Sequence, residues 1–303
     1  MNNPLDPARI GIDLGGTKIE AVLLDASGAV VRTLRAKTPR DDYDGTLERV
    51  RTFVAELEVG LDSAATVGVG TPGAISPATG RIKNANSTWL NGRPLLADLS
   101  RVLERAVRVA NDADCFALSE AVDGAATGAR IVFGAILGTG VGGGIVVDGR
   151  LVSGPNAIGG EWGHNPLPWP REGEWPGPAC YCGRTGCIET LLSGPGLAAE
   201  HERTTGQRVG PPEIVARAAQ GDGQAQATLA RYEERLARGL ASVINLLDPD
   251  VIVLGGGLSN LERLYDSVPR LWGAWVFTDR VDTRLVPPAH GDSSGVRGAA
   301  RLW

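Results

Sequence analysis

The sequence predicts an α/β protein whose two similar halves face each other across a cleft. Short apolar segments of strand length alternate along the chain with segments of helical periodicity. Two strand pairs, at residues 9–25 and 131–149, each enclose a glycine-rich turn that carries a threonine. A chain of 303 residues is also long enough to build two domains.

The composition is that of an ordinary soluble globular protein, with 43% apolar and 21% charged residues. A net charge of −5 without a basic block argues against binding to nucleic acid or to an anionic membrane surface. The start of the chain, MNNPLDPARIG, has no apolar run and predicts no signal peptide. No later run reaches the roughly 18 apolar residues of a membrane helix. We therefore predict a cytoplasmic protein.

Residues 9–14 (RIGIDL) form the first predicted strand, and a second strand pattern resumes at Ile19. The intervening Gly15-Gly16-Thr17-Lys18 predicts a β-hairpin turn. A P-loop is excluded, because it requires G-x4-G-K-[ST] leading into a helix. The turn could place backbone N–H groups at a phosphate, with Asp13 facing the metal of that phosphate. The alternative is an ordinary hairpin whose Asp13 and Lys18 are solvated.

Residues 44–58 have the apolar spacing of an amphipathic helix, and residues 66–69 form a strand that ends at the turn Thr71-Pro72-Gly73. The next segment, residues 83–91 (KNANSTWLN), is polar and contains three asparagines. Asparagine side chains both donate and accept hydrogen bonds, as the recognition of sugar hydroxyls requires. The alternative is a plain turn rich in asparagine.

A helix at 94–105 and a strand at 107–110 precede Asn111-Asp112, and a helical pattern follows over 113–120. A carboxylate between the carboxyl end of a strand and a helix lies where open α/β sheets build ligand sites. Either residue could instead be a helix N-cap, which contributes about 1 kcal/mol.

The second glycine unit begins with a strand at 131–137, continues through GTGVGGG at 138–144 and leads into another strand. A lone glycine loop is weak evidence for a ligand. The repetition of the layout is stronger, and it predicts that each hairpin contacts a different phosphate of one nucleotide bound in the cleft.

Residues 159–189 are too rich in proline and glycine for a helix or a central strand, yet too rich in tryptophan and cysteine for disorder. Cys180, Cys182 and Cys187 are spaced as C-x-C-x4-C, and His164 precedes them. Three thiolates and one imidazole can form a closed tetrahedral zinc site. The alternatives are a disulfide, which would leave one cysteine unpaired, and inert buried cysteines. The fourth cysteine, Cys115, is predicted to lie in the core.

The C-terminal part is predicted to be helical at 193–202, 211–220 and 223–247, followed by a buried strand at 250–254. Glycines 255–257 follow that strand and could approach a flat adenine closely, the alternative being a tight turn. The tail ends in a helical pattern whose Gly298-Ala299-Ala300 step would allow close packing.

These motifs resemble those of the ROK family (repressors, open reading frames and sugar kinases) over nearly the whole chain. The matching pieces are DLGGTK at 13–18, ND at 111–112, GTGVGGG at 138–144, EWGH at 161–164, CYCGRTGCIE at 180–189 and LGGG at 254–257. Within the family the chain looks most like bacterial fructokinases of the manno(fructo)kinase type.

The resemblance implies an actin-like ATPase (ribonuclease H-like) fold, in which two α/β domains enclose a cleft. The small domain would comprise residues 1–112 with a C-terminal helix at about 291–303, and the large domain residues 113–290 with the zinc and sugar loop 159–189. ATP and Mg²⁺ are the implied nucleotide and metal. The residues implied to hold them are Asp13, Gly15, Gly16, Thr17, Lys18, Gly138, Thr139, Gly140, Gly142, Gly255, Gly256, Gly257 and Asn260.

By the same resemblance, Asp112 is the catalytic base and zinc is structural, held by His164, Cys180, Cys182 and Cys187. The implied sugar ligands are Asn86, Asn111, Asp112, Glu161, His164 and Glu189, with Asn84 as an alternative to Asn86. His164 can fill both roles if its second ring nitrogen faces the sugar.

We therefore expect an ATP-dependent fructokinase that phosphorylates the 6-hydroxyl of fructose. The alternatives within the family are glucose, mannose or N-acetylglucosamine as substrate. A different class is a non-catalytic ROK sugar-binding regulator, although the first strand starts near residue 9 and leaves no room for a helix-turn-helix. The family also implies a homodimer.

Overall fold

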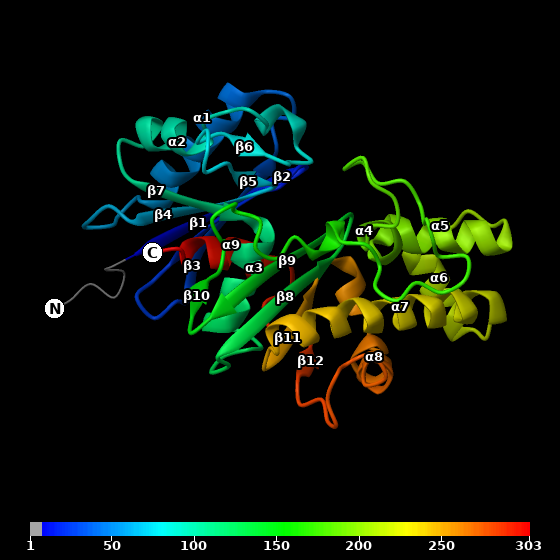
Figure 1. The fold of residues 1–303 in the computed structure, drawn as a ribbon. Coiled ribbons are helices and arrows are strands. Elements are labelled where there is room, and N and C mark those ends of the chain that lie inside the picture. Colours follow the sequence, from blue (N-terminus) through cyan, green and yellow to red (C-terminus); the bar gives the residue numbers. More distant parts are fainter. Residues whose placement is uncertain (1–7) are drawn as a thin grey trace.

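The computed structural model describes residues 8–303, which build two five-stranded sheets with helices around them (Figure 1). The first sheet has the strand order β3 (Val30–Lys37), β2 (Lys18–Leu24), β1 (Arg9–Leu14), β4 (Thr66–Thr71) and β7 (Val107–Asn111). The second sheet has the order β10 (Arg150–Leu151), β9 (Val141–Val147), β8 (Ile131–Leu137), β11 (Val251–Gly255) and β12 (Arg284–Val286). A separate small sheet pairs β5 (Ala74–Ile75) with β6 (Ile82–Lys83).

The two large sheets repeat one connectivity. In the first, β1 and β2 form an antiparallel hairpin, and β4 and β7 follow parallel to β1. In the second, β8 and β9 form the hairpin, and β11 and β12 follow parallel to β8. The prediction of two similar halves, each opening on a glycine hairpin, is thereby confirmed.

Helices α3 (Asp112–Val122) and α9 (Ser294–Ala300) pack against each other in the middle of the molecule (Figure 1). Their contact is so close that a Cβ at Gly298 would lie 1.6 Å from the carbonyl oxygen of Cys115. The other face of α9 approaches the first sheet just as closely, because Gly11 of β1 and Gly68 of β4 have no Cβ. The close packing predicted for the C-terminal tail is confirmed.

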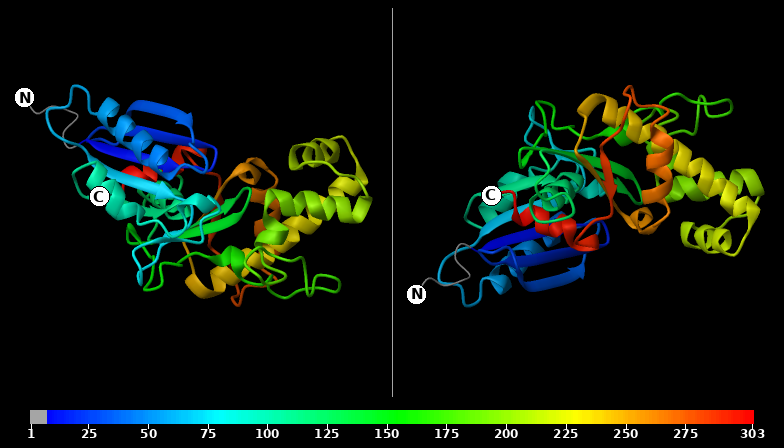
Figure 2. Two further views of the ribbon diagram at one scale, coloured as in Figure 1. Left: turned by 90° about the horizontal axis from the view of Figure 1, so that it is seen from above. Right: turned by 90° about the horizontal axis from the view of Figure 1, so that it is seen from below.

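Each half has its own core. On the first sheet, buried side chains come from the strands and from α1 (Tyr43–Leu57) and α2 (Leu95–Val102). On the second sheet they come largely from α7 (Gly223–Leu247), whose Leu229, Leu236 and Leu240 are at most 1% exposed. The remaining helices of this half are α4 (Glu189–Leu192), α5 (Gly194–Thr205), α6 (Pro211–Ala219) and α8 (Leu264–Trp272). Figure 2 shows α5, α6 and the end of α7 projecting away from the first half.

Two predicted boundaries differ from the structure. Glycines 142–144 belong to β9 rather than to the turn, because α3 packs directly on that strand and a Cβ at Gly144 would lie 2.5 Å from the carbonyl oxygen of Ala113. The C-terminal helix covers only Ser294–Ala300 instead of 291–303. The division into domains 1–112 with 291–303 and 113–290 stays a prediction, and residues 1–7 of it lie outside the described residues. Within residues 8–303, no helix combines the length and the apolar character needed to cross a membrane.

Candidate functional site

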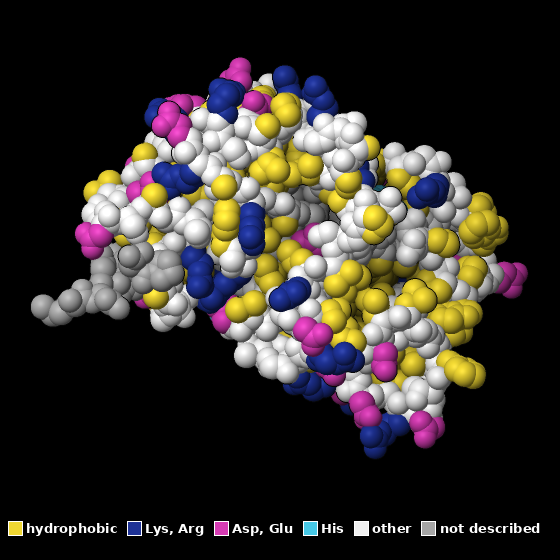
Figure 3. Space-filling view, turned by 60° about the vertical axis from the view of Figure 1, so that its left-hand side comes forward, with side chains coloured by type: hydrophobic (Ala, Val, Ile, Leu, Met, Phe, Trp, Pro, Cys, Tyr) yellow, Lys and Arg dark blue, Asp and Glu magenta, His cyan; other side chains and the backbone are white. Residues whose placement is uncertain are grey.

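A polar cleft of about 300 Å³ lies between the two halves. Its walls come from the strand ends and loops of both sheets, and Figure 3 shows this face hollowed near its centre, with an acidic side chain visible inside. The lining side chains that bear polar groups are Asn84, Asn86, Asn111, Asp112, Asp114, Thr139, Glu161, His164, Tyr181 and Glu189. No lysine or arginine is among the lining residues that the structure describes. The cleft is therefore rich in hydrogen-bond acceptors.

Asn111 and Asp112 join the end of β7 to the start of α3. The Asn111 side chain caps the helix by accepting from the Ala113 N–H at 2.9 Å, and its amide donates to the carbonyl oxygen of Gly73 at 2.9 Å. The cap alternative is thus correct for Asn111, although this residue also lines the cleft. Asp112 Oδ1 accepts from the Ala113 N–H at 2.8 Å. These hydrogen bonds fix both side chains at the point where the two halves meet.

Burial raises the pKa of Asp112 to about 6, and the charge of Glu161 adds to this, against the hydrogen bond from the Ala113 N–H. Asp13, at the end of β1, also has its pKa raised, to about 7, by burial and then by Asp112. A base with a pKa near neutrality is suited to accept a proton and to release it again. Asp112 therefore has the placement and basicity of a general base.

Asp114 is a further carboxylate of the cleft that the sequence reasoning missed. Burial, followed by the charges of Asp112 and Glu161, raises its pKa to about 7. The only signal in the sequence was its place two residues after Asp112, on the first turn of the helix.

The predicted sugar ligands converge on the cleft from both halves. Asn84 and Asn86 lie in the segment after β6, and both line the cleft, so the choice between them stays open. Glu161 precedes the short helix Trp162–His164, and Glu189 opens α4. Glu189 Oε2 is fixed by the N–H of Val141 at 2.9 Å.

The first glycine hairpin is shaped as predicted, but its lysine has a partner within the protein. Lys18 Nζ lies 3.1 Å from Glu20 Oε2, and Thr38 Oγ1 donates to the carbonyl oxygen of Gly15 at 2.6 Å. Gly16 lies beside Ser87, so the turn is next to the asparagine-rich segment. Neither the cleft nor the apolar hollow beside it is lined by residues 13–18. Their contact with a phosphate stays a prediction.

A second, apolar hollow of about 840 Å³ adjoins the second glycine hairpin. Its lining residues are Gly138, Thr139, Gly194, Pro195, Ala198, Pro211, Pro212, Val215, Gly257, Leu258, Asn260 and Leu261. Gly138 and Thr139 line the polar cleft as well, so the two spaces meet at this turn. An apolar hollow that opens on a polar cleft can hold a flat base with its phosphates directed into the cleft.

Two of the glycines predicted to hold the nucleotide serve packing. A Cβ at Gly255 would lie 2.7 Å from the ring of Phe116, and one at Gly256 would lie 2.6 Å from the carbonyl oxygen of Leu137. Gly256 also has a φ of 78°, which favours glycine. Of the third glycine cluster, only Gly257 lines the hollow.

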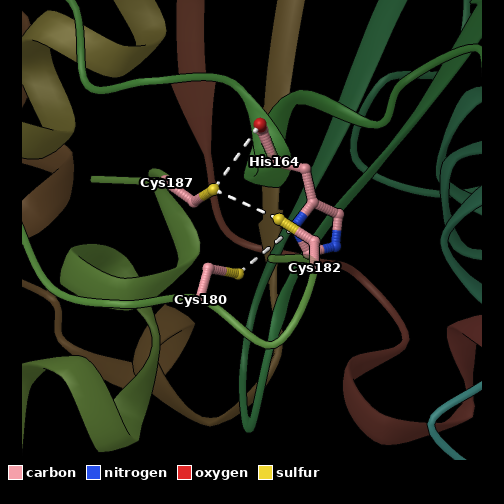
Figure 4. A group of neighbouring side chains, drawn as sticks. All are labelled: His164, Cys180, Cys182 and Cys187. Atoms are coloured by element: carbon pink, nitrogen blue, oxygen red, sulfur yellow. Dashed lines mark hydrogen bonds between the residues drawn. The ribbon is translucent and has the colours of Figure 1, made fainter. Parts of the chain in front are cut away.

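The four predicted zinc ligands point toward one another at the edge of the cleft (Figure 4). Their ligand atoms all lie within 4.8 Å of each other. Cys180 Sγ is 3.6 Å from His164 Nδ1, and Cys182 Sγ is 3.6 Å from Cys187 Sγ. Zn–S bonds of about 2.3 Å and Zn–N bonds of about 2.0 Å give tetrahedral edges of about 3.5–3.8 Å, so the donor set fits zinc.

The alternatives to zinc fit less well. A disulfide would require sulfur atoms about 2.05 Å apart, whereas Cys182 and Cys187 are separated by 3.6 Å. Inert core cysteines would all be buried, but Cys182 is exposed. Cys115, in contrast, is fully buried in α3 and lies outside the group, as predicted.

Tyr181 is the second residue of the site that the sequence reasoning did not identify. Its hydroxyl oxygen lies 3.0 Å from His164 Nε2, the ring nitrogen that the sequence analysis expected to face the sugar. A tyrosine side chain has an ordinary pKa of about 10, so the hydroxyl keeps its proton at neutral pH. Its position between Cys180 and Cys182 was the only signal in the sequence.

A buried network of ion pairs holds the outer part of the loop 159–189. Arg238 of α7 is fully buried and contacts Glu174 and Glu234 at 2.8 Å each, while Arg235 reaches Glu174 at 2.8 Å. Arg238 also donates to the carbonyl oxygen of Trp169 at 2.6 Å. The loop is thus anchored both at the cysteine–histidine group and on α7.

The Glu174 network predicts a specific loss of stability in acid. Burial alone would raise the Glu174 pKa, but the hydrogen bonds from Arg238 and Arg235 lower it to about 2, from 4.5 in an unstructured chain. A lowered folded-state pKa stabilises the protein above pH 4.5, and this stabilisation is lost as the pH falls toward 2. Glu174→Gln should therefore weaken the decrease in unfolding free energy over that range, measured by urea denaturation.

The control is Glu48→Gln, which removes an exposed ion pair with Arg51 and should leave the free energy of unfolding nearly unchanged. An unchanged pH dependence in Glu174→Gln would contradict the assignment of the acid sensitivity to this network.

Residues 9–303 match the ROK family. The chain belongs to the ROK family. It is 41% identical over 305 residues to an N-acetyl-D-glucosamine kinase of Shigella flexneri serotype 5b, and the match covers 96% of this chain and 98% of that protein.

Solved ROK structures share the fold. A ROK hexokinase from Thermus thermophilus is similar with a TM-score of 0.85 and 30% identity over 97% of this chain and 96% of that one. A ROK family glucokinase from Streptomyces griseus, in complex with glucose and AMPPNP, has a TM-score of 0.79 and 27% identity over 97% and 98%. The predicted actin-like ATPase fold of a ROK sugar kinase is confirmed.

Proposed function

We propose that this protein transfers the terminal phosphoryl group of ATP to the 6-hydroxyl of a hexose or an N-acetylhexosamine. The observation that carries the proposal is the meeting of a polar cleft and an apolar hollow at Gly138 and Thr139. The half-buried carboxylate of Asp112 lies in the polar cleft. This arrangement suits a sugar and a nucleotide that bind on either side of one turn.

In the proposed reaction, Asp112 accepts the proton of the attacking sugar hydroxyl. Its position at the first residue of α3 favours the carboxylate, because a helix N-terminus stabilises negative charge. Burial opposes this effect and keeps the pKa near neutrality. Asp112 thus combines a fixed orientation with a useful basicity.

The sugar is held by groups that accept hydrogen bonds from hydroxyls. Glu161 and Glu189 provide carboxylates from the second half, and Asn111 with Asn86 or Asn84 provides amides from the first. Zinc, bound by His164 and the three cysteines, would keep the segment between Glu161 and Glu189 in shape and take no part in the transfer. This division explains why the cysteines lie at the edge of the cleft.

The nucleotide would place its base in the apolar hollow beside Gly257 and Asn260, with its phosphates near Thr139. Bound Mg²⁺ supplies neutralisation of phosphate charge in such reactions. Asp13 is half-buried, and it is close enough to Asp112 for the charge of Asp112 to raise the Asp13 pKa. It is the carboxylate of the first hairpin available to that ion or its waters.

Two sugars compete as the preferred substrate. Fructose is the expectation from the sequence motifs. The 41% identity to enzymes named N-acetyl-D-glucosamine kinase supports N-acetylglucosamine. Glucose and mannose are further candidates, since a glucokinase and a hexokinase share the fold.

Family resemblance also leads us to propose a homodimer. Support comes from Phe277, which is fully exposed, and Leu246, which is 82% exposed. Their segments are joined by the Asn245 side chain, which accepts from the Phe277 N–H at 2.9 Å. Burying such side chains against a second copy would be favourable, and light scattering would measure the mass of the assembly.

The test is a coupled assay of ADP release with Mg-ATP and each of fructose, N-acetylglucosamine, glucose and mannose. We expect release with at least one of them, and N-acetylglucosamine and fructose compete for the highest kcat/KM. Sugar binding by calorimetry without ADP release from any sugar would support a non-catalytic ROK regulator and contradict the proposal.

A further inference from the structure

Tyr181 is the residue by which the cysteine segment 180–187 lines the polar cleft. It lies between Cys180 and Cys182, its ring is 73% exposed, and it lines the polar cleft. The ring meets that of His164 edge to face, with 5.2 Å between centroids and an interplanar angle of 86°. The Tyr181 ring therefore packs against the imidazole of His164, on the cleft side of the cysteine–histidine group.

The hydrogen positions of this pair follow from metal binding. His164 Nδ1 is the ring nitrogen beside Cys180 Sγ, at 3.6 Å, and so is the one that faces the zinc position. A metal-bound imidazole is neutral and carries its proton on the other nitrogen. Nε2 then donates to the Tyr181 oxygen, 3.0 Å away. The tyrosine's own proton remains free to be donated to a ligand.

The two carboxylates near the Tyr181 hydroxyl cannot donate a hydrogen bond to a ligand. Glu189 and Glu161 act on Tyr181 through their charges, and ionised carboxylates only accept hydrogen bonds. The Asn111 amide uses one of its two N–H donors on the carbonyl oxygen of Gly73. Asn84 and Asn86 belong to the other half of the molecule. Tyr181 therefore offers a side-chain donor, close to these two carboxylates, to a substrate group that accepts hydrogen bonds.

We infer that Tyr181 is a specificity-determining residue that selects sugars with an acetamido group. The carbonyl oxygen of that group accepts the free hydroxyl proton of Tyr181. Its methyl group lies against the exposed aromatic ring, with Ile158, 47% exposed, as a second apolar residue of the cleft wall. This inference rests on the proposed function and assigns N-acetylhexosamines as the preferred substrate class.

A sugar with a hydroxyl in place of the acetamido group has different hydrogen-bonding needs. A hydroxyl can donate to Glu161 or Glu189 and does not depend on a donor from the protein. Burying a carbonyl oxygen without a donor carries a desolvation cost, since such a group loses its hydrogen bond to water. Removing the Tyr181 hydroxyl should therefore affect N-acetylglucosamine far more than glucose.

The test compares Tyr181→Phe with the unchanged zinc-loaded protein. Calorimetry without ATP should show a Kd for N-acetylglucosamine raised about tenfold and a Kd for glucose changed by less than about twofold. The ratio of kcat/KM between the two sugars should shift by the same factor. Zinc content, measured by atomic emission, should stay equal to that of the unchanged protein.

Tyr43→Phe is the matched control, because it also removes a tyrosine hydroxyl but lies in α1 and bonds to Asp98 at 2.8 Å. An equal loss for both sugars in Tyr181→Phe, or no loss for either, would overturn the role of Tyr181. If no sugar is phosphorylated by the unchanged protein, the proposed function fails, and the calorimetric ratio still decides the role of Tyr181.

Discussion

The Asp112→Asn variant is expected to lose turnover by about 10²–10⁴-fold, the usual contribution of a positioned general base. Asparagine keeps the size and the oxygen that accepts from the Ala113 N–H, but it cannot take up a proton from a sugar hydroxyl. Sugar binding, measured by calorimetry, should stay within about threefold of the unchanged protein, since a neutral amide still accepts a hydrogen bond.

The pH dependence supplies a second readout for the same residue. The Asp112 pKa is raised to about 6, and a base works only when deprotonated. The unchanged enzyme should therefore lose kcat/KM as the pH falls through about 6, while the residual activity of Asp112→Asn should lack that acid limb.

Asp114→Asn is the matched control for Asp112→Asn. This residue lies two positions further along the same helix turn and has a raised pKa of about 7, but its charge reaches the reaction only through its neighbours. Turnover should fall far less than in Asp112→Asn. Near-normal turnover in Asp112→Asn would refute its role as the base.

Cys182→Ser is expected to abolish zinc binding and, with it, the ordered sugar site. Serine hydroxyls do not replace thiolates as zinc ligands, and structural zinc contributes roughly 10–16 kcal/mol in finger peptides. The backbone N–H of Arg184 lowers the pKa of Cys182 to about 7, so this cysteine provides thiolate readily. Sugar affinity should fall by at least about 100-fold, because Glu161 and Glu189 flank the segment that zinc holds.

The loss should be local, because the outer part of the loop is held separately by Arg238 and Glu174. Circular dichroism should show secondary structure retained while zinc content falls to zero. Cys115→Ala, which changes the buried cysteine of α3, is the control and should keep its zinc. Unchanged metal content in Cys182→Ser would refute the assignment of the ligands.

Much of the fold was predictable because its signals are local. The hairpin of β1 and β2 follows from two apolar strands around Gly15-Gly16-Thr17, and the second hairpin repeats that pattern. The 25-residue α7 follows from its leucine spacing. The start of β9 was harder to predict, since Gly142 to Gly144 have turn-forming character in isolation. Only the approach of α3 to that strand explains why glycines continue a β-strand there.

The residues of the candidate site also divide into those that the sequence predicts and those that it does not. His164, Cys180, Cys182 and Cys187 could be grouped from their spacing, because zinc restricts which residue types can lie close together. Asp112 could be singled out from its place after a strand. Asp114 and Tyr181 could not, since an aspartate in a helix and a tyrosine between cysteines are ordinary in a sequence.

By itself, the sequence determined the two α/β halves, the glycine hairpins and the metal-binding residue types, because each depends on neighbours within a few positions. Only the tertiary structure decided which of these groups share one cleft. Residues far apart in the chain meet there, so that Glu189 is fixed by Val141 and Tyr181 contacts His164. The same folding packs Gly255 against the ring of Phe116. Burial, which sets the basicity of Asp112, likewise exists only once both halves enclose it.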